Sequence, residues 1–359
     1  MRMDFASLVY DHFNDFKSLL ENLDSALGAT SHVLTAIPFG SERPPDKIFE
    51  RAYGNRVFKI LRTSNDVMLF ELHFSAGAQS ESLEGKFFIC KHPLFDDVYI
   101  AVTIESPDFV RRALLPFIEQ NRSQLYLAFL RQEQLYSLVK GFLENLSMNE
   151  LRVVRASLVS RFKEETISSV SWTSLDLEGV FRFAEEQNGW FRSLSFEILK
   201  EKKALTNATV HRNGVIKTDG QLLSMYAKFL SPICQTIHEN INLFAKRSRT
   251  ENPRFSVRPL VVEFKKDQFE DVKENAKFIN AIRRLKNASV SVMHGNPYVY
   301  LTVVDYVDGS TFDLWVLNLE QVFIVPQMKS TVAGINRLIN CVFDNYDEGI
   351  IKDFEPASV

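Results

Sequence analysis

Apolar residues recur at steps of three and four along some segments of this chain, and they form alternating or short apolar runs along others. The first pattern predicts amphipathic helices and the second predicts strands. Helices are expected at residues 4–27, 44–53, 108–121, 124–146, 176–188, 221–246, 268–285 and 330–346. Strands are expected at residues 33–37, 56–62, 67–74, 85–90, 98–104, 151–162, 190–199, 204–211, 255–264, 289–293, 298–305, 311–317 and 321–325, and a further short run ends at Trp172. Because short turns join consecutive strands into antiparallel meanders, the sequence predicts an α+β fold with helices packed on one face of the sheets.

The same order of elements occurs near both ends of the chain. Residues 4–121 and residues 221–346 each follow the order helix, strand, helix, four strands, helix. No residue identity accompanies this match, so two interpretations stay open: an ancient duplication, or the coincidence of common α+β parts. We expect an N-terminal α+β module (1–122), a helical connector (123–150), a middle α+β module (151–220) and a C-terminal α+β module (221–359).

Composition narrows the class of protein. The chain has 359 residues, of which 45% are apolar and 24% are charged, which is typical of globular protein and excludes a mainly disordered or fibrous chain. Thirty phenylalanines predict a Phe-rich core. Cys90, Cys234 and Cys341 are odd in number and have apolar neighbours, so we expect buried thiols. The N-terminus shows no leader pattern and no apolar run is long enough to span a bilayer, so we expect a soluble, cytoplasmic protein without membrane contact.

Charge is unevenly distributed although the whole chain carries only −3. Residues 240–290 hold twelve Lys or Arg against six acids, and residues 291–359 hold three against nine. The leading interpretation is a non-enzymatic binding protein that engages DNA, RNA or another polyanion through a basic patch in 246–286. The expected contacts are Lys246, Arg247, Arg249, Arg254, Arg258, Arg283, Arg284 and Lys286. The competing interpretation is that the two segments fold against each other and neutralise locally.

The alternative is an enzyme. Glu263 and Lys265 end an apolar strand in the order E-x-K, where a carboxylate could hold Mg²⁺ and an ammonium could steady the attacking water or the phosphate. This resembles half of a PD-(D/E)xK nuclease site, and the resemblance implies a second carboxylate from a neighbouring strand. No clear one is found, since Asp219 follows a turn, but Asp305 is a further candidate catalytic carboxylate. Outside this interpretation we expect no cofactor, no metal site and no catalysis.

Asp305 stands out because it lies on an apolar face. Asp308-Gly309 predicts a two-residue type I′ turn, which would pair Val307 with Ser310. In that register Asp305 shares a face with apolar residues, whereas Asp313 points the other way, together with Tyr300, Tyr306 and Trp315. A carboxylate on an apolar face needs a partner, and we expect an arginine or a backbone amide.

Several motifs are absent or incomplete. The chain has no phosphate-binding P-loop, no G-x-G-x-x-G, no G-x-S-x-G and no C-x-x-C, which argues against the corresponding nucleotide, hydrolase and zinc sites. The zincin-like run that begins at His238 lacks its second histidine, and His294 in a turn is expected to be a surface residue. A third interpretation is a protein-interaction subunit of a larger assembly, in which the apolar faces of helices at 108–146 bind a partner. The compact chain leads us to expect a prokaryotic source.

Overall fold

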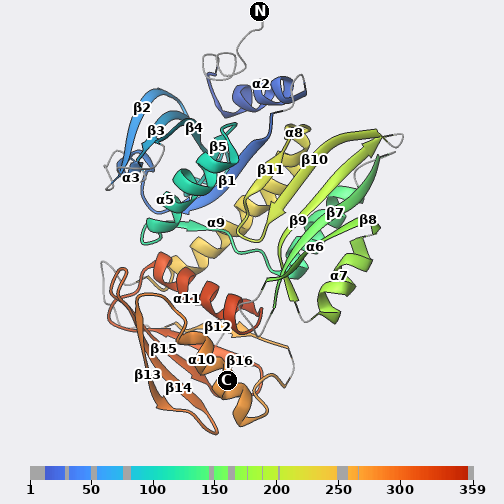
Figure 1. Cartoon of the computed structure of the whole chain (residues 1–359). Coiled ribbons are helices and arrows are strands. Elements are labelled where there is room, and N and C mark those ends of the chain that lie inside the picture. Colours follow the sequence, from blue (N-terminus) through green and yellow to red (C-terminus); the bar gives the residue numbers. More distant parts are fainter. Residues whose placement is uncertain are drawn as a thin grey trace, which may run out of the picture. The chain divides into compact units, whose positions relative to one another are not determined.

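The computed structural model describes residues 13–28, 32–49, 55–75, 82–144, 149–160, 166–175, 177–187, 189–200, 203–248, 258–265 and 267–354. The chain divides into two compact units, Met1–His238 (unit 1) and Glu239–Val359 (unit 2). Both combine helices with antiparallel sheets, so the predicted α+β class is confirmed (Figure 1). The module boundaries expected near residues 122, 150 and 220 all lie within unit 1.

Unit 1 contains one antiparallel sheet, with eleven strands among the described residues. The strands are β1 (Leu34–Ser41), β2 (Arg56–Ser64), β3 (Val67–Phe74), β4 (Leu83–Lys91), β5 (Val98–Thr103), β6 (Leu125–Leu127), β7 (Asn149–Ser160), β8 (Thr166–Leu175), β9 (Gly189–Lys200), β10 (Lys203–His211) and β11 (Ile216–Thr218). Their spatial order is β2-β3-β4-β5-β1-β11-β10-β9-β7-β8, and β6 also pairs with β1. The pairing of β1 with β11 joins two meanders that the sequence analysis had assigned to separate modules.

The helices of unit 1 are α2 (Phe16–Gly28), α3 (Asp46–Phe49), α4 (Pro107–Phe109), α5 (Leu115–Gln120), α6 (Gln132–Glu144), α7 (Leu177–Glu186), α8 (Leu222–Met225) and α9 (Ser231–Ala245), the last of which runs on into unit 2. Two π-helical segments, η1 (Val110–Leu114) and η2 (Tyr226–Leu230), interrupt predicted helices. The second precedes Pro232, which cannot donate a backbone hydrogen bond, and helical geometry continues from η2 through α9 without the division expected at this proline.

Phenylalanine rings fill the core between β2–β4 and the helices that follow β5. The ring of Phe49 lies 4.8 Å from Phe117, 5.4 Å from Phe58, 5.5 Å from Phe70 and 5.8 Å from Phe87, measured between centroids. Tilted and edge-to-face ring pairs of this kind stabilise the folded state beyond the effect of apolar burial alone. The Phe-rich core expected from composition is therefore present in unit 1.

The predicted connector helices contribute to this core as well. Phe109 and Leu114 belong to the same buried cluster, and Val139 and Phe142 of α6 are at most 1% exposed. The apolar faces expected to bind a partner at 108–146 are thus covered within unit 1.

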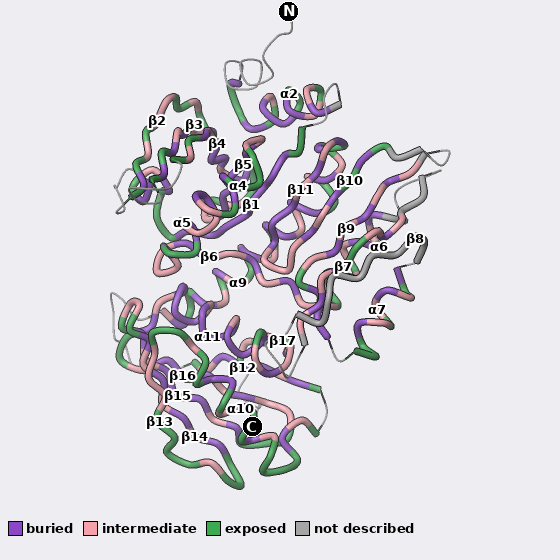
Figure 2. The backbone as a smooth tube through the Cα atoms, in the orientation of Figure 1, coloured by how far each residue is buried: buried purple, intermediate pink, exposed green. Residues whose placement is uncertain are grey.

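Unit 2 contains β12 (Leu260–Glu263), α10 (Val272–Ile282), β13 (Ala288–His294), β14 (Val299–Asp305), β15 (Ser310–Val316), β16 (Gln321–Pro326), α11 (Val332–Asn345) and β17 (Ile350–Asp353). Its sheet has the order β13-β14-β15-β16-β12-β17. Without β17, this order is the same as β2-β3-β4-β5-β1 in unit 1, so the two predicted repeats of element order also share their strand arrangement. Buried and half-buried residues alternate along β14 (Figure 2), because one face of the sheet carries the helices.

The hairpin between β14 and β15 differs from the prediction. Asp305 pairs with Ser310, so four residues form the loop and the predicted pairing of Val307 with Ser310 is wrong. Only Gly309 in this loop has a positive φ, of 78°, whereas a type I′ turn needs two such residues. The register shifts by two positions, which leaves the side chains that remain in β14 and β15 on their predicted faces. The wider loop is stabilised by backbone hydrogen bonds that the Asp305 and Asp308 side chains accept. These bonds outweigh the local preference of Asp-Gly for a two-residue turn.

Candidate ligand-binding face of the C-terminal sheet

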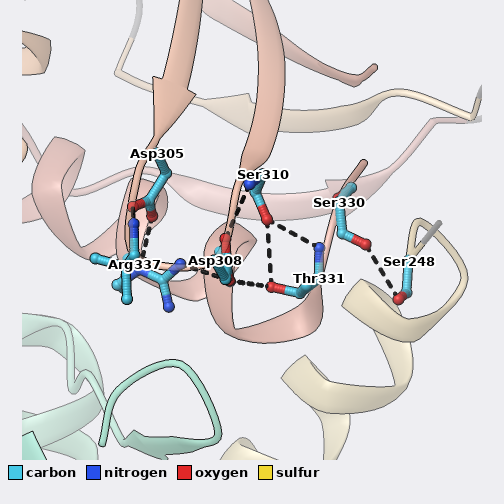
Figure 3. A network of polar contacts seen from close by, with 9 residues as sticks. Ser248, Asp305, Asp308, Ser310, Ser330, Thr331 and Arg337 are labelled. Atoms are coloured by element: carbon cyan, nitrogen blue, oxygen red, sulfur yellow. Dashed lines mark hydrogen bonds and ion pairs between the residues drawn. The ribbon is translucent and has the colours of Figure 1, made fainter. Parts of the chain in front are cut away.

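A buried polar network connects the β14–β15 loop to the start of α11 (Figure 3). Arg337 Nε donates to Asp305 Oδ2 at 2.7 Å, and Arg337 Nη2 donates to Asp308 Oδ2 at 2.6 Å. The other oxygen of Asp305 accepts the backbone N–H of Val307 at 2.9 Å. Both partners that the sequence analysis required for Asp305, an arginine and a backbone amide, are therefore present.

The rest of the network caps α11. Thr331 Oγ1 donates to Asp308 Oδ2 at 2.6 Å and accepts the backbone N–H of Gly334 at 2.8 Å. Burial alone would raise the pKa of Asp308, but hydrogen bonds from Thr331 and Arg337 together outweigh it and hold that pKa below its usual value. Asp305 has a side chain only 1% exposed. These groups are enclosed and paired, so their arrangement fixes the helix on the sheet and leaves no place for a substrate.

The predicted catalytic residues do not meet. Glu263 pairs with Gln321 at one end of the sheet, whereas Asp305 pairs with Ser310 at the opposite end. Lys265 lies beyond the last residue of β12 and is exposed. Asp305 therefore does not supply the second carboxylate of a site at Glu263 and Lys265, because the register of β14, β15 and β16 separates them.

Glu263 has other partners. Lys352 Nζ lies 2.8 Å from its Oε1, and Gln321 Nε2 donates to its Oε2 at 3.2 Å. The hydrogen bond from Lys352, followed by that from Gln321, lowers the pKa of Glu263. Within the described part of the chain, no group of three or more His, Cys, Asp and Glu side chains with metal-ligand spacing includes Glu263.

The predicted basic patch separates into distinct parts. Arg247 has no exposed side-chain area and forms an ion pair with Asp353, so its assignment to a binding surface is wrong. Its guanidinium also donates to the backbone oxygens of Leu243 and Pro259, which ties α9 to the strand that follows. Lys246 lies 3.5 Å from the same Asp353 but keeps 56% of its side chain exposed.

The remaining predicted cations lie in different places. Arg249 and Arg254 fall outside the described residues. Arg258 precedes β12, whereas Arg283, Arg284 and Lys286 follow α10, and all four are exposed. Arg284 Nη1 lies 3.5 Å from Asn345 Oδ1 at the end of α11. The predicted basic cluster is therefore divided. One cation lies before the start of β12, and three lie after the end of α10.

The face of this sheet opposite the helices carries a row of aromatic side chains. Successive cross-strand pairs join His294 to Tyr300, Tyr300 to Trp315, and Trp315 to Phe323. Residues paired in this way point to the same side of an antiparallel sheet. The row points away from α11, since Asp305, which meets that helix, lies on the other face of β14. Four rings thus cross four neighbouring strands.

Asp313 lies in the adjoining row on this face. Its carboxylate accepts hydrogen bonds from Tyr300 Oη at 3.1 Å, Thr302 Oγ1 at 2.8 Å and Gln327 Nε2 at 2.7 Å. The residue is 8% exposed, and no lysine or arginine among the described residues forms an ion pair with it. These three donors hold the Asp313 carboxylate in place beneath the surface. The hydrogen bond from Tyr300 in turn fixes the position of the Tyr300 ring.

A groove of about 500 Å³ continues the row at its other end. It is lined by Val261, Gln321, Phe323, Lys352, Asp353 and Phe354. The rings of Phe323 and Phe354 meet edge to face at 6.1 Å, and Lys352 is 49% exposed beside them. This groove combines ring surfaces, an ammonium and an amide, and it is open to a planar ligand.

Sequence reasoning found only part of this face. Alternation correctly placed Tyr300 and Trp315 opposite Asp305, although Tyr306 belongs to the loop and not to the row. Phe323 and Phe354 were missed because their positions depend on pairing with β12 and on β17, which no pattern predicted. The sequence does contain a signal for the row: Tyr300, Trp315 and Phe323 lie in three consecutive predicted strands.

Comparison of the chain with models of known protein families gives no match, and comparison with curated proteins gives none. In the described parts of the chain, no helix has both the length and the apolar character needed to cross a membrane.

Proposed function

We propose that this chain is a non-enzymatic binding protein whose C-terminal unit binds single-stranded nucleic acid on the open face of its sheet. The observation that carries the proposal is the cross-strand row of His294, Tyr300, Trp315 and Phe323 on the face without helices. Aromatic rings on an exposed antiparallel sheet offer stacking surfaces for unpaired bases, and such stacking is worth about 1–3 kcal/mol per base.

The groove at Phe323 and Phe354 suits one base. Its volume of about 500 Å³ falls within the usual range for small-molecule pockets. Phe354 is 36% exposed, so one ring can cover a base while Gln321 offers an amide to the base edge. A duplex would hide its bases from this surface, and we therefore expect preference for single strands.

Few cations border the face. Lys352 lines the groove, Lys246 is paired with Asp353 of the same groove, and Arg258 precedes the neighbouring strand. Three phosphate contacts imply a slope of about −2 for the logarithm of the association constant against the logarithm of salt concentration. A basic patch containing all eight predicted cations would give a much steeper slope.

The experiment measures fluorescence anisotropy of labelled single-stranded and double-stranded DNA and RNA across a salt series. We expect single strands to bind and the Phe354→Ala variant to weaken binding about fivefold or more, the equivalent of one stacked base. Val272→Ala is the matched control, since Val272 is an exposed apolar residue, 56% accessible, at the start of α10. Equal binding by both variants would contradict the stacking surface.

Charge variants distinguish this face from the cations after α10. Lys352→Gln should weaken binding and reduce the salt slope by about 0.7, while Lys286→Gln should leave both unchanged. If Lys286→Gln and Arg283→Gln lower the affinity and Lys352→Gln does not, the contact lies at the end of α10 and the open face is not the site.

Glu263→Gln separates binding from the nuclease alternative. Removal of this carboxylate frees Lys352 from its ion pair at 2.8 Å, so a phosphate would meet an unpaired ammonium. We expect affinity to increase about twofold to fivefold, as for one exposed ion pair. Cleavage of the oligonucleotide in Mg²⁺ that Glu263→Gln abolishes would instead establish the nuclease.

A further inference from the structure

A histidine and two glutamates meet on the sheet of unit 1. Glu71 and His73 are two residues apart on β3, and Glu84 on β4 pairs directly with His73. One ligand atom from each of these residues lies within 4.8 Å of the other two. In the part of the chain that the structure describes, this is the only trio of His, Cys, Asp and Glu with that spacing.

The imidazole contacts both carboxylates at once. His73 Nε2 lies 3.4 Å from Glu71 Oε2, and His73 Nδ1 lies 3.4 Å from Glu84 Oε2. A neutral imidazole has one N–H, so only one of these contacts can be a hydrogen bond. The other carboxylate then faces a nitrogen lone pair. A metal ion bound at this place would remove that repulsion.

The trio is accessible to a metal ion from solvent. His73 is 48% exposed and Glu84 is 62% exposed, whereas Glu71 is 17% exposed and more firmly positioned. Lys59 and Lys86 occupy the positions across from Glu71 on the two neighbouring strands. These lysines offset part of the charge of Glu71. The more negative side of the trio is therefore the side at Glu84 and His73.

We propose that Glu71, His73 and Glu84 bind a divalent transition metal ion of the Zn²⁺ class and thereby link β3 to β4. One imidazole nitrogen and two carboxylate oxygens are ligands that Zn²⁺ accepts, with water in the fourth position. Mg²⁺ and Ca²⁺ suit the trio poorly because they prefer more oxygen ligands and no imidazole. The sequence analysis expected no metal site, since it searched for ligands close together in the chain and this trio forms across two strands.

The test is isothermal titration of the full chain with ZnCl₂ and, separately, with MgCl₂ at neutral pH. We expect one equivalent of Zn²⁺ to bind, no Mg²⁺ to bind, loss of Zn²⁺ binding in His73→Ala, and at least tenfold weakening in Glu84→Gln. His32→Ala is the control, because His32 is an exposed histidine of unit 1 that does not belong to the trio. Addition of Zn²⁺ should also raise the melting temperature of the parent chain and not that of His73→Ala.

Two results would overturn the proposal. The first is the absence of Zn²⁺ binding by the parent chain. The second is Zn²⁺ binding that persists unchanged in both His73→Ala and Glu84→Gln, which would place the ion elsewhere. Neither result depends on nucleic-acid binding, so this test stands apart from the proposed function.

Discussion

The segment β1–β5 of unit 1 and the sheet of unit 2 share one strand order but hold their covering helices by different interactions. In unit 1 the helices after β5 pack on the sheet through rings, with Phe117 of α5 on Phe58 of β2 at a centroid distance of 4.4 Å. In unit 2 the helix after β16 also buries apolar residues, and Arg337 adds a polar bridge to Asp305 and Asp308. Strand order therefore does not determine the chemistry of the helix–sheet interface, since apolar packing with or without a buried ion network satisfies the same arrangement.

The difference extends to how each unit titrates. Burial, followed by the electrostatic interaction with His238, lowers the pKa of His92 in unit 1 to about 4. Burial, followed by Lys217 and Arg192, lowers the pKa of His211 to about 4 as well. In unit 2 the perturbed groups include Asp308 and Asp353, whose pKa values lie below the usual 3.8 because hydrogen bonds from Arg337 and Arg247, respectively, help to outweigh burial.

The largest expected effect is acid destabilisation of unit 1 alone. A buried histidine with a lowered pKa stays neutral in the folded state while the unfolded state takes up protons below about pH 6.5. Stability is therefore complete above pH 6.5 and decreases as the pH falls toward 4, by roughly 3 kcal/mol from His92 and a similar amount from His211. The carboxylates of unit 2 lose their contribution only below about pH 3.8.

Urea denaturation at pH 7 and pH 4.5, with hydrogen-exchange pulse labelling at one fixed pH, would resolve the two units. Peptides from unit 1 should unfold at lower urea concentration at pH 4.5, and peptides from unit 2 should not shift. His92→Phe should reduce the pH dependence of unit 1. A parallel shift of both units would contradict this assignment of the titrating groups.

The second-largest expected effect is the loss of stability of unit 2 in the Arg337→Ala variant. The substitution leaves Asp305 and Asp308 buried without their cation, which costs roughly 3–5 kcal/mol. Chemical denaturation with the same labelling should show the loss in unit 2 only. The triple variant Arg337→Met, Asp305→Asn and Asp308→Asn should recover part of it, because no unpaired charge then remains. A loss under 1 kcal/mol would mean that the network contributes little.

A smaller effect is expected when a methyl group is added to a glycine of α11 or of α6. A Cβ on Gly334 would lie 2.4 Å from Ser310 Oγ, inside the polar network, so Gly334→Ala should cost about 1–3 kcal/mol. Gly141→Ala in α6 is the matched control, since nothing lies within 4 Å of its added Cβ. That variant should be neutral or more stable by up to about 1 kcal/mol through helix propensity. Equal thermal shifts in the two variants would contradict a close fit at Ser310.

Much of the fold could be predicted because it depends on local patterns. The elements of residues 288–345 were placed within a few positions, since β14 alternates strictly and the apolar residues of α11 recur at helical steps. The face of Asp305 and its need for a partner followed from the same alternation. The π segments η1 and η2 were not predicted, because single-turn π geometry has no distinct periodicity over so few residues.

Local pattern by itself determined the α+β class, the order of elements that occurs twice, the burial of the cysteines and the two-sided character of β14. Only the tertiary structure decided which distant residues meet: Arg337 with Asp305, Arg247 with Asp353, Lys352 with Glu263, and His73 with Glu84. The physical reason is that alternation along a strand sets the face of a side chain, whereas strand order and register set its neighbours. A row of rings such as Tyr300, Trp315 and Phe323 therefore becomes visible only when the strands are paired.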